Sequence, residues 1–240
     1  MENFALYQLY EWYRAAVAPL QTAASMSRNV LDMPLSMAPH THAGRQMLAG
    51  AELLERLTRN YTKPRFDIQE VTIDGTPVRV ENRIVMREDF CHLRHFRRHF
   101  PRGKARRNDP KILVVAPMSG HHATLLRGTV QALIPHGDIY ITDWVDAKEV
   151  PVMEGSFDLD DFIAMVWDCI RFIGKDTHVI AVCQPAVPVL AATALMSEDE
   201  DPFTPRSITL MGGPIDTRVG VTPVNTMANE RPLSWFERTV

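Results

Sequence analysis

The sequence places one cysteine, Cys183, between two apolar stretches of different kinds. HVIAVC (178–183) predicts a buried strand, and QPAVPVLAATALM directly after it predicts a helix. On such a tight strand-to-helix turn, a nucleophilic side chain is exposed above the strand ends, and the next backbone N–H faces the developing oxyanion. The helix N-terminus there favours the thiolate, which is the reactive form of the side chain. We therefore predict that Cys183 is a nucleophile and that the backbone N–H of Gln184 is one oxyanion donor.

The residues around Cys183 match the G-x-S-x-G pattern of such turns only in part. Ala181 and Pro185 stand where the pattern has glycines. Alanine is small enough for the turn, and proline is tolerated in the first turn of a helix, where a backbone N–H has no intrahelical acceptor. A lone cysteine after an apolar stretch is otherwise a small buried hydrophobe, which is our interpretation of Cys91 and Cys169.

A Ser-Gly-His-His loop follows the apolar run ILVVAP (112–117). In hydrolases with a strand-to-helix nucleophile, the second oxyanion donor comes from the loop after an earlier strand. We predict that the backbone N–H groups of His121 and Ser119 fill this role. Gly120 lets the backbone approach the substrate closely, and we place it with His122 among the substrate-binding residues.

Four short stretches that predict strands alternate with helical patterns. They are ILVVAP (112–117), DIYITDW (138–144), HVIAVC (178–183) and SITLMGG (207–213). This alternation is typical of βαβ units on a parallel sheet. Upstream, an Asp74-Gly75 step between alternating apolar and polar residues predicts a hairpin that adds antiparallel strands. Together these elements predict an α/β-hydrolase-like fold with a mostly parallel sheet, an antiparallel N-terminal hairpin and N-terminal helices.

We divide the chain into an N-terminal helical segment, residues 1–60, and a hydrolase domain, residues 61–240. Apolar spacing predicts amphipathic helices over 3–25 and 44–59, joined by a linker over 26–43. The aromatic face of the first helix packs on its own domain or, as the alternative, docks on a lipid or polymer surface.

A basic stretch occupies residues 91–107, with seven Lys or Arg side chains between Arg94 and Arg107. We interpret it as a solvated basic face that precedes a buried strand. The alternative is a metal site formed by Cys91, His92, His95 and His99.

Composition argues against several classes of protein. The chain has 240 residues and a net charge of −3, which argues against general nucleic-acid binding. Its three widely spaced cysteines suggest neither a disulfide framework nor a CxxC zinc site, and they fit a reducing cytoplasm. The first residues lack the features of a signal peptide, and no apolar run approaches the roughly 18–20 residues that span a bilayer. No cofactor or metal is implied.

The sequence resembles the intracellular polyhydroxyalkanoate (polyhydroxybutyrate) depolymerases along nearly its whole length. The stretches that carry the resemblance are LYQLYEW, FCHLRHFRR, VAPMSGHHATLLRGTV, ITDWVDAKEVP and VIAVCQPAVPVLAA. The resemblance implies an α/β-hydrolase in which Cys183 stands where most relatives have serine. It implies that the substrate and partner is amorphous polyester in cytoplasmic storage granules. The thiolate would attack a backbone ester, and the acyl-enzyme would be hydrolysed to 3-hydroxyacid oligomers or monomers.

Such a nucleophile needs a histidine base and an acid, in the chain order nucleophile, acid, histidine. None of the nine histidines follows Cys183, and the last of them is His178. The resemblance implies that the acid and the histidine lie beyond residue 240, so we expect an N-terminal portion of a longer enzyme, with a fold incomplete at its C-terminus. Asp216 is an acid candidate by its position after the fourth of the stretches that predict strands.

Two other interpretations stay open. One is an acyltransferase similar to the polyhydroxyalkanoate synthases, against which Ala181 and Pro185 argue, since glycines are expected at those places. The other is a non-catalytic protein of the granule surface, bound through the aromatic helix and the basic stretch. The oligomeric state is not predicted.

Overall fold

The structure is a computed structural model that describes residues 40–58, 63–100, 109–118 and 122–239, together with single positions at Trp12, Ala16, Pro19, Thr22 and Met26. The chain divides into two units, residues 1–63 and 64–240, and each is described by itself.

In the first unit, α2 spans His42–Thr58 and confirms the helix predicted over 44–59. Apart from the single positions, the helix predicted over 3–25 lies outside the described residues, as does most of the predicted linker.

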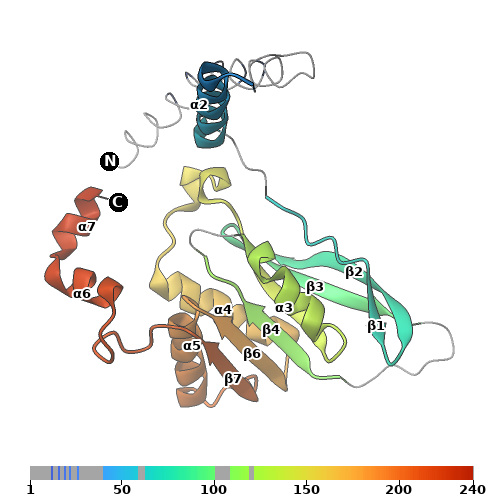
Figure 1. Ribbon diagram of the computed structural model, residues 1–240. Helices are drawn as coiled ribbons and strands as arrows, with labels where there is room; N and C mark the ends of the chain where they lie inside the picture. The colour runs from blue at the N-terminus through green and yellow to red at the C-terminus, as the bar shows by residue number, and fades with distance from the viewer. Residues whose placement is uncertain are drawn as a thin grey trace. The chain divides into compact units, whose positions relative to one another are not determined.

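The second unit is built on a seven-stranded sheet in the order β1-β2-β3-β5-β4-β6-β7 (Figure 1). The strands are β1 (Glu70–Ile73), β2 (Thr76–Arg87), β3 (Cys91–His99), β4 (Lys111–Val115), β5 (Asp138–Trp144), β6 (Thr177–Val182) and β7 (Ser207–Met211). The pairs β1–β2, β2–β3 and β3–β5 are antiparallel, whereas β5, β4, β6 and β7 pair in parallel. A parallel sheet with an antiparallel N-terminal edge and this crossover order is an α/β-hydrolase-like fold, which confirms the predicted fold class.

Helices cover both faces of the sheet (Figure 1). The helical segments are η2 (Ala123–Leu126), α3 (Arg127–Leu133), η3 (Ala147–Glu149), η4 (Val152–Glu154), α4 (Leu159–Ile173), α5 (Ala186–Glu198), α6 (Pro223–Glu230) and α7 (Leu233–Thr239). None of the helices among the described residues is both long enough and apolar enough to cross a bilayer.

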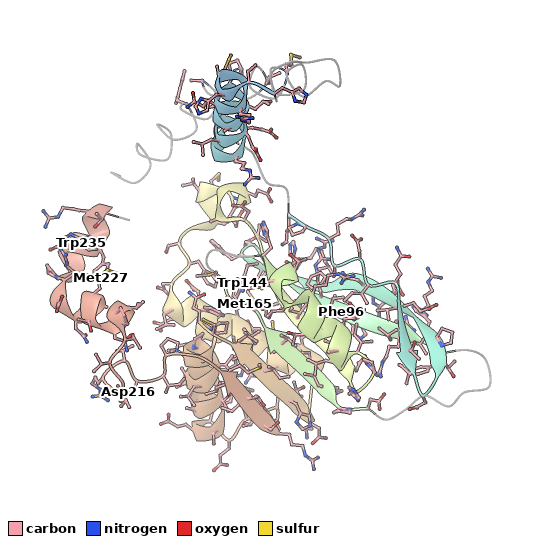
Figure 2. All side chains as sticks on the ribbon, in the orientation of Figure 1. Phe96, Trp144, Met165, Asp216, Met227 and Trp235 are labelled. Carbon is pink, nitrogen blue, oxygen red and sulfur yellow. The ribbon has the colours of Figure 1, made fainter. Side chains whose placement is uncertain are left out.

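Two hydrophobic cores lie on opposite faces of the sheet. In the first, η2 and α3 contribute buried residues such as Val130, which pack with Phe96 and Ile141 of the strands. In the second, α4 and α5 contribute residues such as Val166, which pack with Trp144. Phe96 and Trp144 are labelled in Figure 2. Successive side chains of a strand point to opposite faces, so a central strand covered on both faces has a continuous apolar run, as residues 112–115 of β4 show.

The predicted hairpin is present between β1 and β2. Its turn consists of Asp74 (φ +49°) and Gly75 (φ +72°), and Ile73 pairs with Thr76 across it. Two central residues with positive φ form the turn type that matches the twist of antiparallel strands, and aspartate and glycine tolerate that conformation.

The interpretation of residues 91–107 as a solvated basic face is wrong over the part that forms β3. This strand lies inside the sheet between β2 and β5, and Cys91, Leu93 and Phe96 are fully buried. The alternation of apolar with polar residues, rather than the total charge, determines the local structure here.

The basic side chains of β3 are accommodated by ion pairs. Arg94 Nε lies 2.5 Å from the Asp143 carboxylate, and Arg98 Nη1 lies 2.7 Å from the Asp109 carboxylate. Both carboxylates are buried, and a buried charge loses its hydration. Each guanidinium offsets this loss by forming an ion pair with one carboxylate. The strand can therefore be interior although it is rich in arginine.

Substitution of Leu93 tests the position of β3. Leu93→Ala is expected to lower the free energy of unfolding by about 2–5 kcal/mol, because it removes a fully buried side chain. Arg97→Ala, on the same strand but partly exposed, is the matched control and is expected to cost less than about 1 kcal/mol. Urea unfolding measures both variants. Equal small effects would contradict an interior strand.

Candidate active site

The order of the parallel strands creates a switch point at the carboxyl ends of β4 and β6. The chain passes from β4 to β5 on one side of β4, and later returns to β6 on the other side. The helices that follow these two strands, α3 and α5, consequently cover opposite faces of the sheet. In open α/β sheets, ligands bind in the crevice that such diverging loops leave at the strand ends. Two segments flank this point, namely the loop after β4 and the turn that contains Cys183.

Cys183 forms a strained turn between β6 and α5. It has φ +66°, it directly follows the last residue of β6, and its side chain is exposed. A left-handed conformation costs an ordinary residue about 1–2 kcal/mol, so the surroundings must hold it. The Cys183 N–H donates to the Met211 carbonyl at 2.8 Å, and its own carbonyl accepts from the Ala186 N–H at 3.0 Å. The prediction of a tight strand-to-helix turn at Cys183 is confirmed.

Among the described residues, five that are not glycine have positive φ. Asp67, Asp74 and Asp176 are aspartates, which tolerate the left-handed region. Glu200 comes just after α5, where a left-handed residue commonly ends a helix. Neither explanation applies to Cys183, and strain of this kind clusters at active sites.

Gly213 makes the Cys183 turn possible, and it is not among the site residues predicted from the sequence. A Cβ atom at this position would lie 2.0 Å from the Ala186 Cβ and 2.7 Å from the Cys183 carbonyl oxygen. The chain after β7 therefore presses directly on the start of α5. Ala181 is fully buried beneath the turn, and Pro185, with φ −61°, precedes the helix in a compatible conformation. The signal in the sequence is the Gly-Gly pair that ends SITLMGG.

The structure brings the turn and the loop after β4 together. The side-chain oxygen of Gln184 accepts a hydrogen bond from the Met118 backbone N–H at 2.9 Å. His122 is half-buried, and its carbonyl accepts from the Leu125 N–H at 2.9 Å where η2 begins.

Three of the predicted site residues, Ser119, Gly120 and His121, lie outside the described residues. Their roles, the backbone role of Gln184 and the substrate contact of His122 stay predictions.

The other two cysteines are structural. Cys91 and Cys169 are both fully buried in the second core. Burial raises the pKa of the Cys169 thiol, and the nearby charges of Asp168 and Glu88 add to this effect. A thiol held neutral in an apolar core is not a nucleophile, which supports the interpretation of both as small hydrophobes.

Three histidines with described partners, His95, His99 and His178, lie toward the opposite edge of the sheet from Cys183. His99 Nε2 lies 2.8 Å from the Glu81 carboxylate at the end of β3. His95 Nε2 lies 2.8 Å from the carboxylate of Asp138, the first residue of β5. Burial acts against ionisation of Asp138, but the hydrogen bond and charge of His95 contribute to a net lowering of its pKa. His178 stands near the start of β6, with Nδ1 2.7 Å from the Ser207 hydroxyl. None of the three is placed to act on the thiol.

The acid candidate Asp216 is engaged by a neighbour. Arg218 donates to its two carboxylate oxygens at 2.8 and 2.9 Å. These hydrogen bonds hold the pKa of the exposed Asp216 carboxyl below its usual range. The pair is a local ion pair of the segment after β7, which Figure 2 labels at Asp216.

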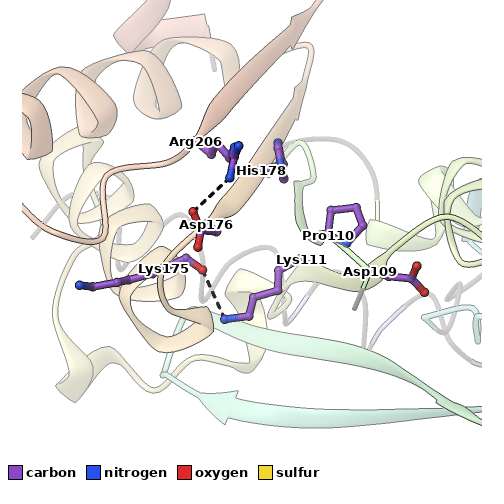
Figure 3. Close-up of a pocket in the computed structure, with 7 residues that line it drawn as sticks. All are labelled: Asp109, Pro110, Lys111, Lys175, Asp176, His178 and Arg206. Atoms are coloured by element: carbon purple, nitrogen blue, oxygen red, sulfur yellow. Dashed lines mark hydrogen bonds and ion pairs between the residues drawn. The ribbon is translucent and has the colours of Figure 1, made fainter. Parts of the chain in front are cut away.

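A cavity of about 410 Å³ lies at the amino edge of the sheet (Figure 3). Its lining residues are Asp109, Pro110, Lys111, Lys175, Asp176, His178 and Arg206. Lys111 donates to the carbonyls of Ile173 and Lys175 at the end of α4, and Arg206 lies 3.5 Å from the Asp176 carboxylate. β4 and β6 begin at this edge and run toward the opposite edge, where Cys183 follows β6, so this cavity is not part of the candidate active site.

No family model matches the sequence, and no curated protein matches it. Among solved structures, the chain is similar to naproxen esterase (carboxylesterase NP) from Bacillus subtilis, with a TM-score of 0.36 and 15% identity over 55% of this chain and 42% of that one. It is similar to an arylesterase, with a TM-score of 0.34 and 11% identity over 68% of this chain and 50% of that one.

A third similar structure is a hyperthermophilic esterase from the archaeon Pyrobaculum calidifontis, with a TM-score of 0.31 and 11% identity over 78% of this chain and 56% of that one. The chain thus spans 42% to 56% of the length of these three proteins. At these scores the similarity assigns no activity, and the fold class rests on the strand order.

The difference in burial predicts selective labelling of the three cysteines. Iodoacetamide applied to the native chain is expected to modify Cys183 alone, because Cys91 and Cys169 are buried. In denaturant all three are expected to react. Peptide mapping by mass spectrometry locates the label, and native modification of Cys169 at the rate of Cys183 would contradict the structure.

Gly213→Ala is expected to disturb the turn. Its new methyl group would overlap the Ala186 methyl, so we expect a loss of about 1–3 kcal/mol in stability and a changed rate of Cys183 alkylation. Gly128→Ala in α3 is the matched control, because a Cβ there meets nothing within 4 Å. It is expected to stabilise the protein by about 0.5–1 kcal/mol and to leave the alkylation rate unchanged. If the two variants behave alike, the packing of Gly213 does not support the turn.

Proposed function

We propose that this protein is a carboxylic ester hydrolase with Cys183 as its nucleophile. The observation that carries the proposal is the left-handed, exposed cysteine between β6 and α5 at the switch point of the sheet. This is the position at which α/β-hydrolases hold their nucleophile, and backbone strain of this kind clusters at active sites.

The proposed reaction begins with attack of the Cys183 thiolate on an ester carbonyl. A carbon–sulfur bond forms, and the carbonyl electrons move to the oxygen. The backbone N–H of Gln184, with that of His121 or Ser119, would stabilise this oxyanion. The intermediate collapses as the carbon–oxygen bond breaks, and the alkoxide leaves and takes a proton from solvent. Water later hydrolyses the thioester to the free acid and the Cys183 thiol. No described residue is assigned as the base.

We propose polyester of 3-hydroxyacids as the substrate. Two of the stretches that resemble the intracellular depolymerases, VAPMSGHHATLLRGTV and VIAVCQPAVPVLAA, fall on the loop after β4 and on the Cys183 turn. Exposed methionines follow or end the parallel strands at the same edge of the sheet. Met118 follows β4, Met153 lies in η4 after β5 and is 95% exposed, and Met211 is the last residue of β7. Exposed apolar side chains of this kind suit contact with an apolar polymer. Association with cytoplasmic storage granules belongs to the same proposal.

A burst experiment tests the nucleophile. At about pH 8.5, where free thiols are half ionised, an aryl ester of 3-hydroxybutyrate is expected to release one equivalent of aryl alcohol per protein chain. Cys183→Ala is expected to abolish this burst, whereas Cys169→Ala, in a buried position, is expected to retain it. A burst of full size in Cys183→Ala would refute the assignment, because another nucleophile would then carry the reaction. The absence of a burst in the unsubstituted chain would favour a non-catalytic protein.

A competition experiment tests the substrate class. Particles of amorphous poly(3-hydroxybutyrate) are expected to slow the burst with the soluble ester, because the polymer occupies the same site. Polystyrene particles of equal size are the control and are expected to have no effect. Equal inhibition by both would show non-specific adsorption to apolar surfaces and would remove the polyester from the proposal.

A further inference from the structure

The chain that leaves β4 is held by side chains of the neighbouring strand β5. The backbone N–H of Ala116 donates to the Thr142 hydroxyl at 2.9 Å, and the Ala116 carbonyl accepts from the Trp144 indole N–H at 2.8 Å. Both hydrogen bonds are buried. A buried backbone group without a partner is destabilising, and these side chains replace the ladder partners that β4 loses at its end.

The same chain is held on its other side by the Cys183 turn. Gln184 Oε1 accepts from the Met118 N–H at 2.9 Å, although the two residues are 66 positions apart. Gln184 is half-buried, and its backbone lies between Cys183 and the start of α5, so its side chain reaches across from a fixed point. Met118 directly precedes the segment that carries the predicted oxyanion donors.

We propose that Gln184 is a positioning residue. Together with Thr142 and Trp144, its side chain fixes residues 116–118, the described start of the loop after β4, and thereby supports acylation of Cys183. The proposal rests on the proposed function and adds to it a role for the side chain of Gln184, distinct from that of its backbone N–H. Glutamine suits this task because its amide oxygen accepts a hydrogen bond without bringing negative charge beside an oxyanion.

The chemistry of the step supplies a selective measurement. In acylation by an aryl ester, the thiolate bonds to the carbonyl carbon, the oxygen gains the electron pair, and the aryloxide then leaves. In alkylation by iodoacetamide, the thiolate displaces iodide from a saturated carbon, and no oxyanion forms. A residue that acts through the oxyanion loop affects the first rate and not the second, whereas damage to the turn itself affects both.

The test compares the acylation and alkylation rates of the unsubstituted chain with those of Gln184→Met. This variant keeps the length of the side chain and removes the amide oxygen that accepts from Met118. Acylation is expected to slow by about 10-fold or more, which is less than the roughly 100-fold to 1000-fold loss when an oxyanion donor is removed outright. Alkylation is expected to stay within about twofold. The matched control is Gln131→Met, because Gln131 Oε1 accepts only a surface hydrogen bond from Arg127 in the described structure, and neither rate should change.

A second pair of variants tests the other side of the loop. Thr142→Ser keeps the hydroxyl that accepts from Ala116 and is expected to retain the acylation rate. Thr142→Val loses it and is expected to slow acylation relative to alkylation. Thermal unfolding confirms that each variant is folded before its rates are compared.

The outcomes separate the two proposals. An unchanged ratio of acylation to alkylation in Gln184→Met, or equal slowing of both, overturns the role of Gln184 and leaves Cys183 as the nucleophile. Absence of acylation at Cys183 in the unsubstituted chain overturns the proposed function and this inference with it.

Discussion

The left-handed backbone of Cys183 is a local conformational cost that the surrounding structure must offset. It is tied to β7 by the hydrogen bond from its N–H to the Met211 carbonyl, and to α5 by the bond from Ala186 to its own carbonyl. Gly213 lets the chain after β7 approach closely enough to support both contacts. These contacts require that β6 and β7 pair in register and that α5 pack on the second core. The exposed position of the Cys183 thiol therefore depends on the pairing of the parallel strands and on the packing of α5 against them.

The order of the strands then determines what surrounds that thiol. Because β4 lies between β5 and β6, the loop that leaves it contacts side chains from both neighbours. Thr142 and Trp144 satisfy Ala116 from one side, and Gln184 satisfies Met118 from the other. Backbone groups of Ala116 and Met118 are thus held at the strand ends by side chains, not by hydrogen bonds between strands. A polar site built in this way can be rigid at the point where a substrate would enter.

Much of the fold follows from local sequence patterns, and the exceptions have physical causes. The apolar runs of β4 and β6 and the Asp74-Gly75 turn carry their own periodicity or turn chemistry, so they are predictable. Strand β3 is not predicted correctly, because its arginines conceal an alternating pattern; Arg94 is neutralised by Asp143, a residue 49 positions away. Cys183 is predictable from the abrupt change of pattern around it. The contact between Gln184 and Met118 depends on the crossover of the chain, which no local pattern contains. Neither the sequence up to residue 240 nor the described residues assign a general base to Cys183.

The central claim is that the fold turns one ordinary cysteine into an acyl acceptor. The most direct measurement is the rate and location of acylation by an aryl 3-hydroxybutyrate ester, followed by peptide mapping with mass spectrometry in native buffer and in urea at the same pH. The account predicts an adduct on Cys183 that forms faster in the folded chain than in the unfolded one. An adduct that forms at the same rate in both states, or that is spread over other nucleophiles while Cys183 stays free, would show that the turn provides no catalytic environment and would contradict the account.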